Sequence, residues 1–172
     1  MWHCPGMKGL YDFSDEHCRA IIDTRNLPLL IAAWGGVPTL KLVSEYFDAH
    51  KEVVEELAAR GERCVMVTRS ESAGRPPADV RQMITDRTAA IREVLNKAIV
   101  ANAIVITNPL VRGAMTAIGW VDPSLRIPYL PSFAAGVQWA REEMAKHGLP
   151  VPDRLREGAV VVDIQRATTV KA

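Results

Sequence analysis

The apolar residues of this chain follow two different spacings, and each spacing predicts one kind of element. Short continuous or alternating apolar runs, bounded by polar or glycine-containing turns, predict β-strands. The run at residues 63–68 is uninterrupted, which indicates a central strand buried on both faces. The predicted strands cover residues 10–13, 17–22, 27–34, 63–68, 103–107, 127–129 and 160–164.

Between these runs the apolar residues recur at every third or fourth position, which predicts amphipathic helices. Pro38 and Thr39 open the first helix, and Gly61 ends it. Ser132 is a natural N-cap for the last helix, which Gly148 ends. The predicted helices cover residues 39–60, 78–101, 111–120 and 132–147.

This alternation of strands and helices is typical of a layered α/β domain with parallel pairs in its sheet. A chain of 172 residues is long enough for one domain with a sizeable core. We expect the domain to cover residues 1–148, with a loose N-terminus. Residues 149–172 are expected to form a C-terminal extension, whose run at 160–164 can pair with a sheet edge or another chain.

Composition narrows the class of protein further. Hydrophobic residues make up 48% and charged residues 24%, as in an ordinary globular domain, and the net charge of +1 argues against nucleic-acid binding. No apolar run approaches the ~20 residues that span a bilayer, so stable membrane insertion is not expected. The N-terminus lacks a signal-peptide pattern, and three cysteines fit a reducing compartment, which together predict a cytoplasmic protein. Cys64 lies in an apolar run and is expected to be buried.

The chain carries no motif for nucleophilic catalysis, a phosphate loop or a dinucleotide, so we expect neither an enzyme nor a cofactor. The pairs His3-Cys4 and His17-Cys18 supply zinc-ligand chemistry, but neighbouring side chains rarely reach one metal. A frayed terminus explains them as well, and no metal is predicted. His50 and His147 stand beside charged residues and are expected on the surface.

The sequence predicts a binding surface at the loops that follow the strands at 63–68 and 103–107. In an open α/β sheet, ligands bind outside the carboxyl ends of the parallel strands. Arginines there, helped by amides at a helix N-terminus, would suit an anion, and a serine there would suit phosphorylation; the alternative is a solvated polar loop. The candidate binding residues are Arg69, Ser70, Ser72, Arg75, Asp79, Asn108 and Arg112.

Tryptophan offers a second set of candidates. Trp34 ends an apolar strand, Trp120 closes a predicted helix, and Trp139 flanks the apolar face of the last helix. Aromatic residues anchor many interfaces, but core packing is the expected use at these positions.

The last third of the chain resembles a known family. The sequence Phe133-Ala134-Ala135-Gly136-Val137-Gln138-Trp139 is similar to the closing helix of the STAS-like (SpoIIAA-like) domains, relatives of anti-sigma-factor antagonists. The resemblance covers about residues 17–147. It implies a single-layer mixed β-sheet with helices packed mainly on one face. It also implies a regulatory role in which a serine near Ser70 or Ser72 is modified, although the usual Asp-Ser-Ser-Gly sequence is absent.

The resemblance and the predicted binding surface together favour a non-enzymatic regulatory or protein-interaction module of a bacterial cytoplasmic system. Its partner would be another protein or a second copy of the chain. One alternative is a carrier of a small apolar ligand or lipid, with a pocket between sheet and helices. Another is an enzyme without a local motif, using Arg112 or Asp79.

Overall fold

The computed structural model describes residues 7–110 and 127–156. These residues form a six-stranded sheet with the strands in sequence order. The strands are β1 (Leu10–Ser14), β2 (Cys18–Asn26), β3 (Leu29–Gly36), β4 (Cys64–Ala73), β5 (Ile99–Val105) and β6 (Tyr129–Leu130). The helices are α1 (Leu40–Ala59), α2 (Ala78–Ala90), α3 (Arg92–Ala98), α5 (Phe133–Lys146) and α6 (Asp153–Arg156).

The sheet is mixed, which confirms the predicted α/β class. The first three strands form an antiparallel meander. From β3 onward the neighbours are parallel, with α1 connecting β3 to β4, and α2 and α3 connecting β4 to β5. The carboxyl ends of β4 and β5 therefore lie at the same end of the sheet, as the predicted binding surface requires.

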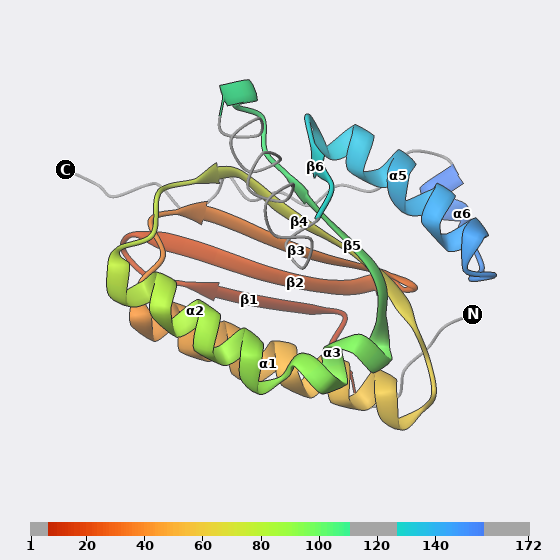
Figure 1. Cartoon of the computed structure of the whole chain (residues 1–172), viewed down its shortest axis with the longest axis horizontal. Coiled ribbons are helices and arrows are strands. Elements are labelled where there is room, and N and C mark those ends of the chain that lie inside the picture. The colour runs from red at the N-terminus through yellow and green to blue at the C-terminus, as the bar shows by residue number, and fades with distance from the viewer. Residues whose placement is uncertain (1–6, 111–126, 157–172) are drawn as a thin grey trace.

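Helices cover both faces of the sheet, whereas the resemblance implied mainly one face. The reason lies in β3, where residues 29–33 are fully buried and alternate between two apolar clusters. Leu30 and Ala32 pack toward α1, α2 and α3, while Leu29 and Ile31 pack toward α5 and α6. A strand that is apolar on both faces needs cover on both. Figure 1 shows the two groups of helices on different sides of the sheet.

The ends of α1 and α5 follow from local chemistry as predicted. The Thr39 hydroxyl accepts a hydrogen bond from the Leu42 amide at 3.3 Å, and Gly61 has a φ of +67° just beyond the helix. The Ser132 hydroxyl accepts from the Ala135 amide at 3.1 Å. These caps fix where each helix begins and ends.

Several predicted boundaries were wrong, including the end of β2, which lies at Asn26 and not at residue 22. Strand β4 continues past Thr68 to Ala73, because Gly35 and Gly36 pair with Ser72 and Ala73 across a register shift. Pairing to a neighbouring strand overrides the polar composition of this segment. The helix predicted over 78–101 divides at Ile91, and β5 already begins at Ile99.

The C-terminal boundary predicted at residue 148 falls just before a segment that packs onto the domain. Leu155 of α6 is 1% exposed and belongs to the apolar cluster beneath α5, with Leu149 and Val151 beside it. The predicted helix at 111–120, the strand at 160–164, Trp120 and the His3-Cys4 pair lie outside the described residues. In the described part of the chain, no helix has the length and apolar character to cross a bilayer.

Candidate functional site

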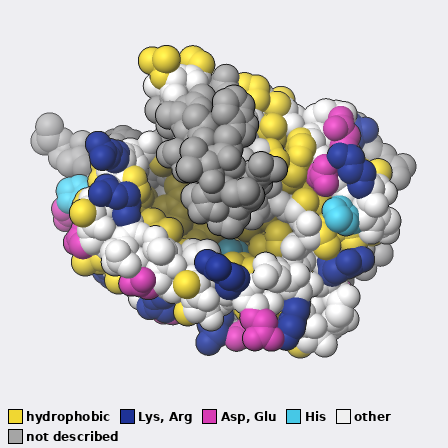
Figure 2. Space-filling view, viewed as in Figure 1, with side chains coloured by type: hydrophobic (Ala, Val, Ile, Leu, Met, Phe, Trp, Pro, Cys, Tyr) yellow, Lys and Arg dark blue, Asp and Glu magenta, His cyan; other side chains and the backbone are white. Residues whose placement is uncertain are grey.

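A cavity of about 880 Å³ lies between the sheet and the helices α2 and α3 and continues past β5 to α5. Figure 2 shows hydrophobic side chains gathered in a hollow in the middle of this face. The volume is within the range of small-molecule pockets, which are mostly apolar with a few placed polar groups. Its apolar lining includes Trp34, Met66, Ile84, Leu95, Ile99 and Ile104.

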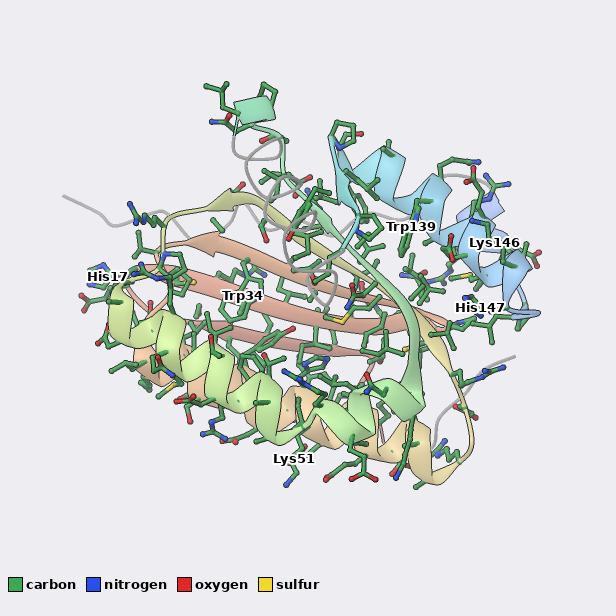
Figure 3. The ribbon with its side chains drawn as sticks, in the orientation of Figure 1. His17, Trp34, Lys51, Trp139, Lys146 and His147 are labelled. Carbon is green, nitrogen blue, oxygen red and sulfur yellow. The ribbon has the colours of Figure 1, made fainter. Side chains whose placement is uncertain are left out.

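The alternation of strand residues explains the floor of the pocket. Trp34 of β3 and Met66 of β4 belong to the apolar cluster on the α1 side, while Val67 belongs to the cluster beneath α5. Figure 3 places Trp34 over the middle of the sheet and Trp139 on α5. Consecutive side chains in a strand point to opposite faces, so on β3 and β4 only residues of one parity reach the pocket.

The pocket extends past the outer edge of β5. Strand β6 pairs only with Ile104 and Val105, so within the described ranges no strand pairs with the rest of that edge. The lining continues from Ala101 to Trp139 and Glu143 on α5. Glu143 is the acidic residue of the described lining, and its carboxylate accepts from Lys146 at 2.6 Å and lies 3.7 Å from His147 Nε2.

His50 is buried at this pocket, which corrects the expectation of a surface histidine. The side chain is 5% exposed, and neither ring nitrogen has a hydrogen-bond partner among residues 7–110 and 127–156. Burial lowers the pKa of His50 to about 4, so the imidazole is neutral at physiological pH. Its neighbours in the sequence are charged, but its spacing of three from Phe47 and four from Val54 places it on the apolar stripe of α1.

Aromatic rings form the wall beside His50. The Tyr46 ring lies 4.5 Å from the Trp34 ring and 5.5 Å from the His50 ring, between centroids. Burial raises the pKa of the Tyr46 hydroxyl, which therefore stays protonated. Trp34 and Trp139 pack against the two apolar clusters, as predicted, and both also line the pocket.

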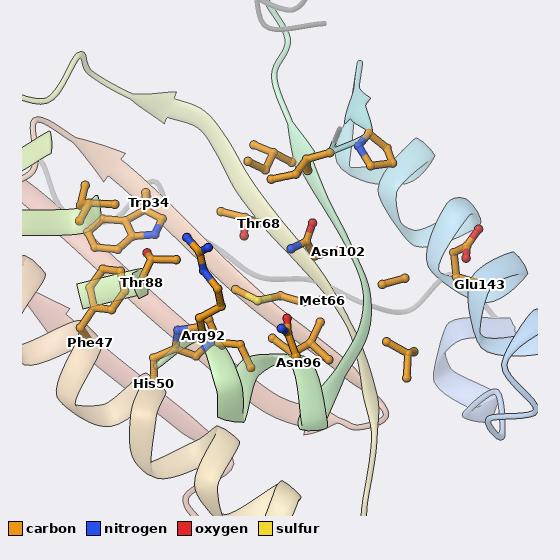
Figure 4. Close-up of a pocket in the computed structure, with 18 of the residues that line it drawn as sticks. Trp34, Phe47, His50, Met66, Thr68, Thr88, Arg92, Asn96, Asn102 and Glu143 are labelled. Carbon is orange, nitrogen blue, oxygen red and sulfur yellow. The ribbon is translucent and has the colours of Figure 1, made fainter. Parts of the chain in front are cut away.

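Arg92 brings a positive charge to the pocket. It is the first residue of α3, directly after the break at Ile91. Figure 4 shows its side chain extending from α3 into the pocket, beside His50 and Thr88. No hydrogen bond or ion pair to its guanidinium is found within residues 7–110 and 127–156. A continuous helix over 78–101 would not have indicated this position.

The binding residues predicted from the sequence lie elsewhere. Arg69 sits on β4, where its Nε donates to Glu71 Oε2 at 2.9 Å and its guanidinium carbon lies 4.4 Å from the centre of the Phe133 ring. Arg69 therefore connects strand β4 to helix α5 through its contact with the Phe133 ring. Ser70 and Ser72 are strand residues of β4, not residues at the start of a helix.

The other candidates lie on loops or helix ends near the predicted binding surface. Arg75 is exposed between β4 and α2, and Asp79 is exposed in the first turn of α2. The Asn108 side chain accepts from the Leu110 amide at 3.0 Å after β5. Arg112 lies outside the described residues. Of the described candidates none lines the large pocket, and only Asp79 borders a smaller depression between α1 and α2.

The buried cysteines are poorly suited to chemistry. Burial raises the pKa of Cys64 to about 12; burial and the nearby Asp15 carboxylate raise that of Cys18 to about 11. Both thiols stay protonated at neutral pH, and Cys64 is buried as predicted. Among the described residues, no three His, Cys, Asp or Glu side chains gather as a metal site.

The arrangement of the pocket suits non-covalent binding. It offers apolar walls, one guanidinium and a neutral imidazole that can donate at one nitrogen and accept at the other. No protein-family model matches the sequence, and no match among curated proteins is found.

Proposed function

We propose that this chain is a binding module that holds a small, largely apolar molecule in the pocket between the sheet and helices α2 and α3. The observation that carries this proposal is the cavity of about 880 Å³, which reaches the buried and unpartnered imidazole of His50. The pocket opens to the surface, and its largely apolar walls make few favourable contacts with water. A largely apolar ligand supplies such contacts.

A titration of the full chain with decan-1-ol, followed by calorimetry, tests the proposal. Thr88 lines the pocket from α2, so Thr88→Trp fills part of the cavity. Thr85→Trp is the matched control, because Thr85 is exposed on the same helix and does not line the pocket. We expect saturable binding by the wild type and Thr85→Trp, and at least a tenfold loss in Thr88→Trp. Equal affinity in all three proteins would contradict the proposal.

A second candidate function is the protein-interaction module that the STAS-like resemblance implies, in a bacterial cytoplasmic system. It is favoured by the exposure of Arg75, Asp79 and Asn108 near the carboxyl ends of the parallel strands β4 and β5. This surface is separate from the pocket, so ligand binding and partner binding can coexist. This function is supported if Arg75→Glu no longer associates with a protein partner or a second copy of the chain while its stability is unchanged.

A further inference from the structure

Three polar side chains of the large pocket, from three different helices, lie beside one another. Arg92 comes from α3, His50 from α1 and Thr88 from α2. Figure 4 shows the Arg92 side chain rising past His50 toward Thr88 and the sheet. The rest of the wall is largely apolar but also includes Thr68, Asn96, Asn102 and Glu143, so a ligand meets a cationic end and a mostly apolar body.

The charge at this end is positive and uncompensated by the described lining. Arg92 has no ion-pair partner within the described ranges, and Glu143 lies away from it on α5, engaged with Lys146. A guanidinium presents a fork of N–H donors that matches a carboxylate with two parallel hydrogen bonds. Arg92 is exposed, so its guanidinium is accessible to a ligand that enters the pocket.

His50 adds an independent reason for a polar ligand group. Its imidazole is 5% exposed and lines the pocket, and neither nitrogen has a partner in the described part of the chain. A buried polar group without a hydrogen bond is destabilising, and the usual resolution is a partner atom. A ligand oxygen beside Arg92 would accept the imidazole N–H.

We infer that the pocket takes a single-chain amphiphile with a carboxylate head, which Arg92 and His50 hold while Trp34, Met66 and Ile104 contact the chain. This inference rests on the proposed binding function and names its ligand class. A carboxylate is favoured over a phosphate because the described lining supplies one cation, which balances a single negative charge. A phosphate near neutral pH carries more charge than one guanidinium offsets.

The test compares decanoate, decan-1-ol and decyl phosphate, each titrated calorimetrically into the full chain. Decanoate is expected to bind at one equivalent and at least tenfold more tightly than decan-1-ol, since a charge-assisted hydrogen bond adds that much affinity. Each methylene added to the acid should raise affinity about fourfold until the cavity is filled.

Variants of the head-group site separate its two parts. Arg92→Gln should reduce decanoate affinity to that of the alcohol and leave the alcohol unchanged, and Arg92→Lys should fall between. His50→Phe should weaken decanoate about fivefold without weakening decan-1-ol. Lys97→Gln is the matched control: Lys97 is exposed on the same short helix, pairs with Glu93 and does not line the pocket, so no ligand should respond.

The outcomes distinguish this inference from the proposal beneath it. Equal affinities for decanoate and decan-1-ol, or an Arg92→Gln variant that binds decanoate normally, overturn the carboxylate assignment and leave the binding function standing. Tighter binding of decyl phosphate than of decanoate overturns the head-group class. No saturable binding of any of the three probes by the wild type overturns the binding function itself.

Discussion

The ring of His50 lies 5.5 Å from the ring of Tyr46, between centroids, and within the described ranges both ring nitrogens of His50 lack hydrogen-bond partners. A polar group in this setting destabilises the fold, by roughly 1–3 kcal/mol. We therefore predict that His50→Phe raises the free energy of unfolding by about 1 kcal/mol while weakening decanoate binding. Urea denaturation at pH 7 measures the first effect. A His50→Phe protein less stable than the wild type would contradict this account of His50.

The same histidine predicts a pH dependence of stability. The folded-state pKa of His50 is about 4 and its ordinary value is 6.5, so between these values the unfolded chain binds a proton that the folded chain does not. Stability is thus lost as the pH falls through this window, by about 2 kcal/mol between pH 7 and pH 5. Denaturation at pH 7 and pH 5 measures this loss. Between these two pH values, His50→Phe should lose about 2 kcal/mol less stability than the wild type. An identical loss in the two proteins would show that His50 titrates normally.

Glycine is required at Gly36, where β3 ends. Its φ is +83°, and a Cβ there would lie 2.1 Å from the His17 carbonyl oxygen. We predict that Gly36→Ala costs about 3 kcal/mol or more, because left-handed strain and a backbone clash add. Gly61→Ala is the control, since Gly61 has a φ of +67° but open space around it, and should cost about 1 kcal/mol. Thermal unfolding of both variants measures the difference, and equal losses would contradict the clash.

Arg69 and Arg75 should respond differently to charge reversal. In Arg69→Glu, two carboxylates repel each other where Arg69 and Glu71 form an ion pair, and the contact with the Phe133 ring is removed. We therefore predict a loss of about 1–2 kcal/mol in the free energy of unfolding. Arg75 is exposed in a loop, and Arg75→Glu should stay within about 0.5 kcal/mol of the wild type. Denaturation curves test both values. If Arg75→Glu proved destabilised, this prediction would be wrong and the variant could not be used to test partner binding.

Apolar spacing was enough to predict most of the architecture. The approximate positions of the strands and the capped ends of α1 and α5 follow from apolar runs, Thr39 and Ser132, because those signals are local. The sequence also contained a signal for His50, its place on the stripe of α1. The charged neighbours outweighed that signal in the prediction, although neighbours in a helix face different directions.

The pocket itself could not be predicted from these patterns. Its residues come from β3, β4, β5 and the helices between them, and its volume depends on how far α2 and α3 stand off the sheet. The break at Ile91, which places Arg92, leaves no glycine or proline signal in the sequence. The polar half of β4 likewise forms through its pairing with Gly35 and Gly36, a long-range contact that local propensity does not contain.

Methyl-detected NMR during a decanoate titration tests the central claim most directly. Met66 and Val67 are neighbours in β4, but Met66 lines the pocket and Val67 packs beneath α5. We predict that the methyl signals of Met66, Ile84 and Leu95 shift and saturate at one equivalent, while those of Val67 and Met144 change little. Shifts spread evenly over both faces, or none that saturate, would contradict a ligand in this pocket.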